Sequence, residues 1–325
     1  MKKRLCCFIL AFILIAICQA GCGKKDNGMK KVVLNEVAHS IFYAPQYVAI
    51  EMGYFKDAGI DLVLETGFGA DKTMTALISG NADIGFMGSE STIYAYAEGS
   101  KDYAVNFAGL TQRAGNFLVA REKIDNFSWD MVKGKKVLGG RKGGMPQMVL
   151  EYILKANNID PASDLSIDQS VDFGLTAGAF SGNTEYDFTV EFEPGATSLE
   201  KEGKGYVVAS LGVDSGYVPY TAYSAKKSYI EKNPEIIKDF TSAIQKGLDY
   251  VNSHSSAEIA KVIAPQFEDT DIDTITTIVE RYKSQDTWKK DTVFTMESFE
   301  LLEDILIEAG ELKEKVPYED LVKVD

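Results

Sequence analysis

Side chains that could bind a small polar molecule lie close together near the N-terminal end of the chain. This stretch offers five candidate contacts: Asn35, His39, Ser40, Phe42 and Tyr43. The amide, the imidazole and the hydroxyl groups can donate and accept hydrogen bonds, and the aromatic rings could stack on a flat molecule. The other histidine of the chain, His254, lies in a polar stretch where we expect no ligand. The alternative for these residues is structural: a loop histidine, and rings packed in a core.

Eight further residues complete the predicted site, and most of them fall at predicted strand ends or helix starts. They are Phe68, Ser89, Glu90, Gln112, Gly143, Gly144, Glu193 and Tyr220. Strand alternation would put Glu193 on the same side as Glu191, where its carboxylate could pair with a ring amine. Ser89 and Glu90 also suit a helix start, as an N-cap and as an acid favoured by the helix dipole. Structural roles therefore stay open as alternatives.

Two arginines could serve a different class of ligand. Arg113 and Arg141 are the candidates that a sulfonate or nitrate would favour, because guanidinium groups bind such anions with charge-assisted hydrogen bonds. Their alternative is an ordinary solvated surface position.

The remaining chemistry argues against an enzyme. All four cysteines (Cys6, Cys7, Cys18 and Cys22) lie in the first 22 residues, so we expect no disulfide, zinc cluster or catalytic thiol in the body. The chain also lacks the Gly-x-Ser-x-Gly and His-Glu-x-x-His motifs. We expect neither a metal nor a cofactor, although hydrolysis by paired carboxylates is left open.

The first residues predict export. Lys2, Lys3 and Arg4 precede an apolar run of about 13 residues, which is too short to span a bilayer but suits a secretory signal. Gln19-Ala20-Gly21-Cys22 then resembles a bacterial lipobox, which predicts a signal peptide over 1–21, lipidation at Cys22 and a flexible tether over 22–30. The alternative is an ordinary signal peptide cut elsewhere. Without its leader the chain carries 31 basic and 48 acidic residues, a balance that argues against nucleic acid.

Strands and helices are predicted to alternate, which favours a mostly parallel sheet covered on both faces. Predicted strands lie at 31–34, 60–65, 83–87, 136–138, 186–192, 206–210 and 220–224. Predicted helices lie at 44–52, 71–79, 90–97, 147–155, 197–202, 234–253, 256–263, 270–284 and 296–309. In such sheets ligands bind beyond the carboxyl ends of strands, which is where the candidate residues fall.

The length predicts two lobes. Removal of 21 residues would leave 304, which exceeds one typical core. We expect lobe 1 to consist of residues 31–117 and 221–325, and lobe 2 of residues 118–220. The crossovers between the lobes are expected near Phe117–Ala120 and Tyr217–Tyr223.

Three sequence blocks together resemble one protein family. They are Asn35 to Leu62 with its Gly53-Tyr54-Phe55 and Gly59-Ile60-Asp61 turns, Leu77 to Met87 with Gly80 and Asp83-Ile84-Gly85, and the loop from Gly139 to Pro146. Their order and spacing resemble periplasmic-type solute-binding proteins of the nitrate/sulfonate/taurine and thiamine-pyrimidine group.

The resemblance implies an α/β fold of the type II periplasmic-binding-protein-like class, with a ligand cleft between two lobes and a helical C-terminal region. It implies a monomeric lipoprotein on the outer face of the cytoplasmic membrane that serves an ABC permease and its ATPase. The ligand expected from His39, the aromatics and Glu193 is a thiamine-pyrimidine-like nitrogen heterocycle. Sulfonate, taurine, nitrate or a flavin stay open, as do a pyrimidine-forming enzyme on this fold and a sensor or adhesion lipoprotein.

Overall fold

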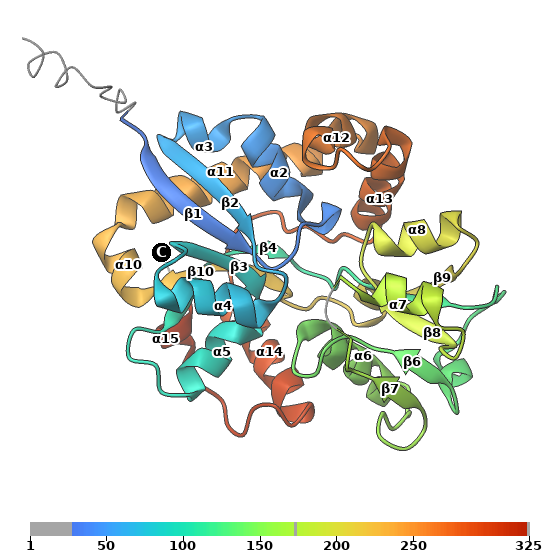
Figure 1. Cartoon of the computed structure of the whole chain (residues 1–325). Helices are drawn as coiled ribbons and strands as arrows, with labels where there is room; N and C mark the ends of the chain where they lie inside the picture. The colour runs from blue at the N-terminus through green and yellow to red at the C-terminus, as the bar shows by residue number, and fades with distance from the viewer. Residues whose placement is uncertain (1–27, 172–173, 324–325) are drawn as a thin grey trace, which may run out of the picture.

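The structure, a computed structural model, describes residues 28–171 and 174–323 (Figure 1). The predicted leader, the lipidation site Cys22 and the tether as far as residue 27 lie outside these described residues. The rest forms two five-stranded sheets, each flanked by helices. The predicted α/β class is confirmed.

The first sheet combines strands from the beginning and from the later part of the chain. Its strands, in spatial order, are β2 (Ile60–Thr66), β1 (Lys30–Glu36), β3 (Ile84–Gly88), β10 (Thr221–Lys226) and β4 (Ala104–Thr111). The first three strands are parallel, and β10 runs antiparallel to both of its neighbours. Strands β3 and β4 are buried along their whole length.

The second sheet has the same arrangement, with three parallel strands followed by an antiparallel strand and an edge strand. Its strands, in spatial order, are β7 (Ser166–Asp168), β6 (Lys136–Leu138), β8 (Phe188–Glu191), β5 (Phe117–Ala120) and β9 (Tyr206–Ser210). Here β5 is the antiparallel strand. In each sheet the antiparallel strand therefore lies beside a segment that joins the two sheets.

Amphipathic helices cover the sheets. In α11, the buried residues Ile237, Phe240, Ile244, Leu248 and Val251 recur at helical spacing and face the core. Helices beside the first sheet are α2 (Ala44–Glu51), α3 (Tyr54–Asp57), α4 (Ala70–Ser79), α5 (Glu90–Ala97), α10 (Lys227–Lys232), α11 (Pro234–Ser253), α12 (Ser256–Ile263) and α15 (Tyr318–Leu321). Those beside the second are α6 (Met145–Ala156), α7 (Thr176–Gly182), α8 (Gly195–Lys201) and α9 (Leu211–Asp214).

Two helices of the C-terminal region touch both halves of the molecule. Helix α14 (Met296–Glu308) packs against α5 of the first half and α6 of the second. Helix α13 (Ile272–Ser284) packs against the short 3-10 helix η1 (Ile41–Tyr43), and its Arg281 reaches residues 193 and 200 of the second half. The C-terminal region therefore contacts the second half of the molecule as well as the first.

The segments that join the two sheets lie close to the expected crossovers. Residues 112–116 directly precede strand β5 at Phe117–Ala120, and residues 211–220, which include α9, directly precede β10. Strand β4 was not predicted, because its run Ala104 to Thr111 is wholly buried and shows no alternation of polar and apolar residues. Among the described residues, no helix has both the length and the apolarity needed to cross a bilayer.

Candidate functional site

A cavity lies between the two sheets, at the carboxyl ends of their parallel strands. Its space is about 520 Å³, including open solvent at the mouth. Loops after β1, β2, β3, β6 and β8 reach it, together with the start of β10. The lining residues are Val37, Tyr43, Gly69, Ala70, Gly88, Glu90, Arg141, Gly144, Met145, Pro146, Phe192, Tyr220 and Thr221. This position is where open α/β sheets bind their ligands.

The carboxyl group of Glu90, hereafter the cavity carboxyl, is the main polar feature of this space. Glu90 begins α5 and is only 2% exposed. Its Oε2 atom is buried without a hydrogen-bond partner in the described chain. Burial raises the pKa of Glu90 to about 7, although backbone N–H groups of Glu90 and Met145 and the charge of Arg141 oppose the shift. Near neutral pH the group is therefore partly protonated, and one of its oxygens is available to a ligand.

Gly88 leaves room for the cavity carboxyl because it has no side chain. A Cβ atom at Gly88 would lie 2.6 Å from Oε1 of Glu90 and closer still to Oε2. Because real Cβ atoms do not approach oxygen so closely, any side chain at this position would displace the carboxyl. The absence of a side chain at the end of β3 thus leaves the space that the Glu90 carboxyl occupies.

Aromatic rings form the apolar wall of the cavity. The rings of Phe192 and Tyr220 lie 6.2 Å apart between centroids, and Phe42 packs behind them at 5.8 and 5.7 Å. Tyr43 lines the cavity as well, held edge-on against Phe86 at 4.5 Å. The hydroxyl of Tyr220 is buried and has no hydrogen-bond partner among the described residues. The wall therefore combines flat apolar faces with one more unused polar atom.

Arg141 lies at the same cavity but faces solvent. Its Nη2 atom is 3.5 Å from Asp71 Oδ1 of α4, and the two side chains are 43% and 59% exposed. An ion pair with this exposure contributes little to stability. It nevertheless joins the β6–α6 loop to α4 of the first lobe.

Similarity to known proteins fits this geometry. A family model described as "NMT1/THI5 like" matches residues 41–257. The chain belongs to the NMT1/THI5-like family. It is 47% identical over 311 residues to YtlA of Bacillus subtilis (strain 168), which is named for an inferred role as a binding protein, with 96% of this chain and 92% of YtlA covered.

Two further comparisons, one of structure and one of sequence, concern more dissimilar proteins. The alkanesulfonate-binding protein SsuA of Xanthomonas axonopodis pv. citri, solved with MOPS, superposes with a TM-score of 0.73 at 14% identity, covering 90% of this chain and 98% of SsuA. A 4-amino-5-hydroxymethyl-2-methylpyrimidine phosphate synthase of Candida albicans (strain WO-1) is 24% identical over 239 residues, with 66% of this chain and 64% of the synthase covered. The resemblance to solute-binding proteins seen in the sequence is confirmed.

Four of the predicted site residues line the cavity, and the others do not. The four are Tyr43, Glu90, Gly144 and Tyr220. The others lie beside it or elsewhere: Asn35, His39, Ser40, Phe42, Phe68, Ser89, Gln112, Gly143 and Glu193. Ligand contact by any of these residues stays a prediction.

His39 serves a buried polar cluster of the first lobe. Its Nδ1 lies 2.8 Å from Glu36 Oε1, and its Nε2 lies 2.7 Å from the carbonyl oxygen of Gln266. Tyr47 donates a hydrogen bond to the other oxygen of Glu36. The hydrogen bond with Glu36 raises the pKa of His39. Both ring nitrogens thus have protein partners.

Glu193 is also paired within the protein. Its carboxylate forms an ion pair with Arg281 of α13 and accepts hydrogen bonds from the backbone N–H and the hydroxyl of Thr197. The strand that should have aligned it with Glu191 ends at Glu191, so alternation does not extend to residue 193. Instead, Phe192 lines the cavity.

The remaining predicted residues have identifiable local roles. The hydroxyl of Ser89 donates to the carbonyl of Pro219 at 2.6 Å rather than capping α5. Gln112 donates to two carbonyl oxygens of residues 286 and 288. Ser40 donates to the carbonyl oxygen of Glu193 and so joins the two halves. Phe68 is 64% exposed with a positive φ of 56°.

Three other predicted residues lie close to the lining. The side-chain oxygen of Asn35 lies near Gly67. It is buried and has no hydrogen-bond partner in the described chain. Phe42 supports the aromatic wall, and Gly143 directly precedes the lining residue Gly144.

Arg113, the other candidate anion binder, donates to the carbonyl of Gly212 and stacks on Tyr217, 4.1 Å from its ring centroid. No cluster of three or more metal-ligating side chains occurs in the described part of the chain.

Proposed function

We propose that this NMT1/THI5-like protein is an extracytoplasmic solute-binding protein that delivers a thiamine-pyrimidine-like nitrogen heterocycle to an ABC importer. A lipid on Cys22 would hold the monomer beside the permease and its ATPase. Lobe 1 (31–117 and 221–325) and lobe 2 (118–220) would close on the ligand by bending at residues 112–116 and 211–220. The family, the similarity to YtlA and the fold shared with SsuA support the transport role.

The cavity carboxyl is the observation that carries the choice of ligand. A protonated carboxyl can donate a hydrogen bond through its O–H and accept one at its other oxygen. A 4-aminopyrimidine presents the complementary pair on one edge: a ring nitrogen that accepts and an exocyclic amine that donates. A pKa of about 7 for Glu90 keeps this protonated form accessible at neutral pH.

The aromatic wall supports the same ligand class. Tyr43, Phe192 and Tyr220 line the cavity. Stacking on such rings stabilises flat heterocycles beyond simple burial of area. The free hydroxyl of Tyr220 offers a further hydrogen bond to a ring substituent.

Sulfonate, taurine or nitrate is the second candidate, and Arg141 favours it. A bound sulfonate carries a permanent negative charge, however, and would lie in a cavity that contains a buried carboxyl. The ionised form of Glu90 would repel it, whereas an ionised Glu90 could still accept a hydrogen bond from the exocyclic amine of the heterocycle.

An enzyme of the synthase type has less support. The cavity lining contains no cysteine, histidine or lysine side chain. Its polar side chains are those of Glu90, Arg141, Thr221 and two tyrosines, a set suited to recognition. We therefore propose binding without chemical conversion.

Calorimetric titration with three probes tests the proposal: 4-amino-5-hydroxymethyl-2-methylpyrimidine, taurine and nitrate. We expect saturable binding of the pyrimidine only. Glu90→Leu should weaken it by about tenfold to a hundredfold, because a buried polar group left unpaired costs about 1–3 kcal/mol. Glu90→Gln should keep most of the affinity, since an amide also offers one donor and one acceptor side by side.

The matched control is Glu98→Leu, which changes an exposed acid at the end of the same helix and should leave the affinity unchanged. Saturable binding of taurine or nitrate without binding of the pyrimidine would replace the heterocycle with an anion. Failure of all three probes, with the protein folded, would contradict the proposed ligand classes.

A further inference from the structure

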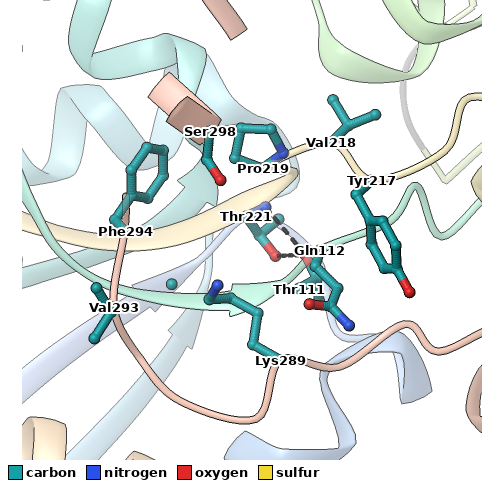
Figure 2. A pocket seen from close by; sticks show the side chains of 11 residues that line it. Thr111, Gln112, Tyr217, Val218, Pro219, Thr221, Lys289, Val293, Phe294 and Ser298 are labelled. Atoms are coloured by element: carbon teal, nitrogen blue, oxygen red, sulfur yellow. Dashed lines mark hydrogen bonds between the residues drawn. The ribbon is translucent and has the colours of Figure 1, made fainter. Parts of the chain in front are cut away.

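A second cavity lies where the two crossover segments meet the loop between α13 and α14 (Figure 2). The space between its lining residues is about 430 Å³, part of which is open solvent. Thr221 contributes to both cavities. The lining residues are Gly109, Thr111, Gln112, Tyr217, Val218, Pro219, Thr221, Lys289, Val293, Phe294 and Ser298. No acidic side chain is among them.

Lys289 is the charged group of this cavity, and the backbone around it directs it inward. The Lys289 N–H donates to the carbonyl of Leu110, and the Gly109 N–H donates to the carbonyl of Thr292. These two backbone hydrogen bonds attach the loop to β4. The lysine stem crosses β4 at Gly109, where an added Cβ would lie 3.1 Å from its Cδ. Figure 2 shows the ammonium directed into the space between Thr221 and Val293.

The Lys289 ammonium lacks a counter-ion. Among the residues that the structure describes, no carboxylate lies within 4 Å of it and no acceptor receives a hydrogen bond from it. Burial lowers the pKa of Lys289, and the charge of Asp291 opposes this shift only in part. A partly buried cation without a partner is unfavourable, so an anion in the cavity would be stabilised.

Two hydroxyl groups add donors beside this cation. Ser298 accepts a hydrogen bond from Thr295 within the first turn of α14, which leaves its own hydrogen free to donate. The hydroxyls of Thr111 and Thr221 are 2.6 Å apart, and whichever of them donates, the other keeps its hydrogen. The polar side of the cavity is thus positive and rich in donors.

Apolar side chains also line the cavity. Figure 2 shows Val293 and Phe294 on one side of it and Val218 and Pro219 on the other, with Ser298 between Phe294 and Pro219. An inorganic anion would leave these apolar side chains uncovered, whereas the hydrocarbon chain of an organic anion would cover some of them.

We propose that this cavity is a second binding site, for a small aliphatic carboxylate whose anionic group pairs with Lys289 and Ser298. Its hydrocarbon chain lies against Val293 and Phe294. An occupant contacts both crossover segments, because Gln112 lies in one and Val218 in the other, and the Val218 N–H donates to the Gln112 carbonyl.

Titration of the purified protein with sodium butyrate tests this site, with saturation-transfer NMR as the readout and sodium chloride at equal ionic strength as the reference. We expect saturable butyrate binding in the natural protein. Lys289→Met keeps the apolar stem and removes the charge, and it should weaken binding about tenfold or abolish it. Lys290→Met changes the exposed neighbouring lysine and should bind as the natural protein does.

Two further measurements make the result decisive. Val293→Trp should fill the cavity and block butyrate while Lys289 is retained, and it should fold because Val293 is 58% exposed. The uncharged analogue 1-butanol should give no saturable signal. The proposal is overturned if Lys289→Met binds butyrate normally, if 1-butanol binds equally well, or if sodium chloride reproduces the response.

Discussion

Replacing Glu90 with glutamine should change how stability depends on pH. The folded protein raises the pKa of this carboxyl from 4.5 to about 7 because the group is buried. A raised pKa means that the folded state binds the proton more tightly than the unfolded state does. The contribution of Glu90 to stability is therefore fully present below pH 4.5 and is lost as the pH rises through about 7.

The size of the effect follows from the same shift. A displacement from 4.5 to about 7 corresponds to a loss of about 2.5 kcal/mol between pH 5 and pH 8. Glutamine resembles the protonated carboxyl and does not ionise. The free energy of unfolding of Glu90→Gln, relative to the natural protein, should therefore rise by about 2.5 kcal/mol over this range.

Urea denaturation at pH 5, 6, 7 and 8 measures this difference directly. Comparing variant with natural protein at each pH cancels the other titrating groups, including Glu191, whose pKa burial also raises to about 7. Glu98→Gln provides the control, because that side chain is exposed at the end of the same helix. A difference for Glu90→Gln that stays constant within about 0.5 kcal/mol, the usual scatter of surface substitutions, would refute the raised pKa of the buried Glu90 carboxyl.

Three other substitutions probe separate parts of the molecule. Arg281→Met should lower the free energy of unfolding by about 3 kcal/mol, because it leaves Glu193 buried without its ion pair; adding Glu193→Gln should recover most of this loss in urea denaturation, and no recovery would count against the pairing. Gly88→Ala should displace the cavity carboxyl and reduce pyrimidine affinity about tenfold in calorimetry, whereas Gly178→Ala, where an added Cβ meets nothing within 4 Å, should not. His39→Gln should destabilise the protein more at pH 5.5 than at pH 8.5, because the stabilisation from a raised histidine pKa is fully present below 6.5 and disappears as the pH passes the folded value; equal losses at both pH values would contradict its bond to a buried carboxylate.

The sequence predicted most strands and helices because their signals are local. Apolar spacing and glycine breaks placed helices such as Pro234–Ser253 correctly. Loops that follow strands also indicated the cleft, which is why Glu90, Gly144 and Tyr220 were expected at the site and line the cavity. These residues were predicted from their places at strand ends and helix starts, and no distant partner had to be identified.

Some predicted site residues have partners far away in the chain that the sequence did not indicate. Glu193 pairs with Arg281, which is 88 residues further on. One ring nitrogen of His39 binds the carbonyl of Gln266, 227 residues away, and ligand contact by either residue stays a prediction. Strand β4 was missed since a fully buried strand shows no period of two. Pairings of this kind follow from the topology, which a single sequence does not reveal.

The position of β4 at the edge of the first sheet also determines the order in which the protein can be completed. All eight of its residues are buried, yet its pairing partners are β10 and the bridges from Trp288 and Val322. A growing chain therefore carries β4 without any partner for more than a hundred further residues. The second sheet, by contrast, uses only strands between Phe117 and Ser210. The half of the protein that is synthesised first is consequently the half that is finished last.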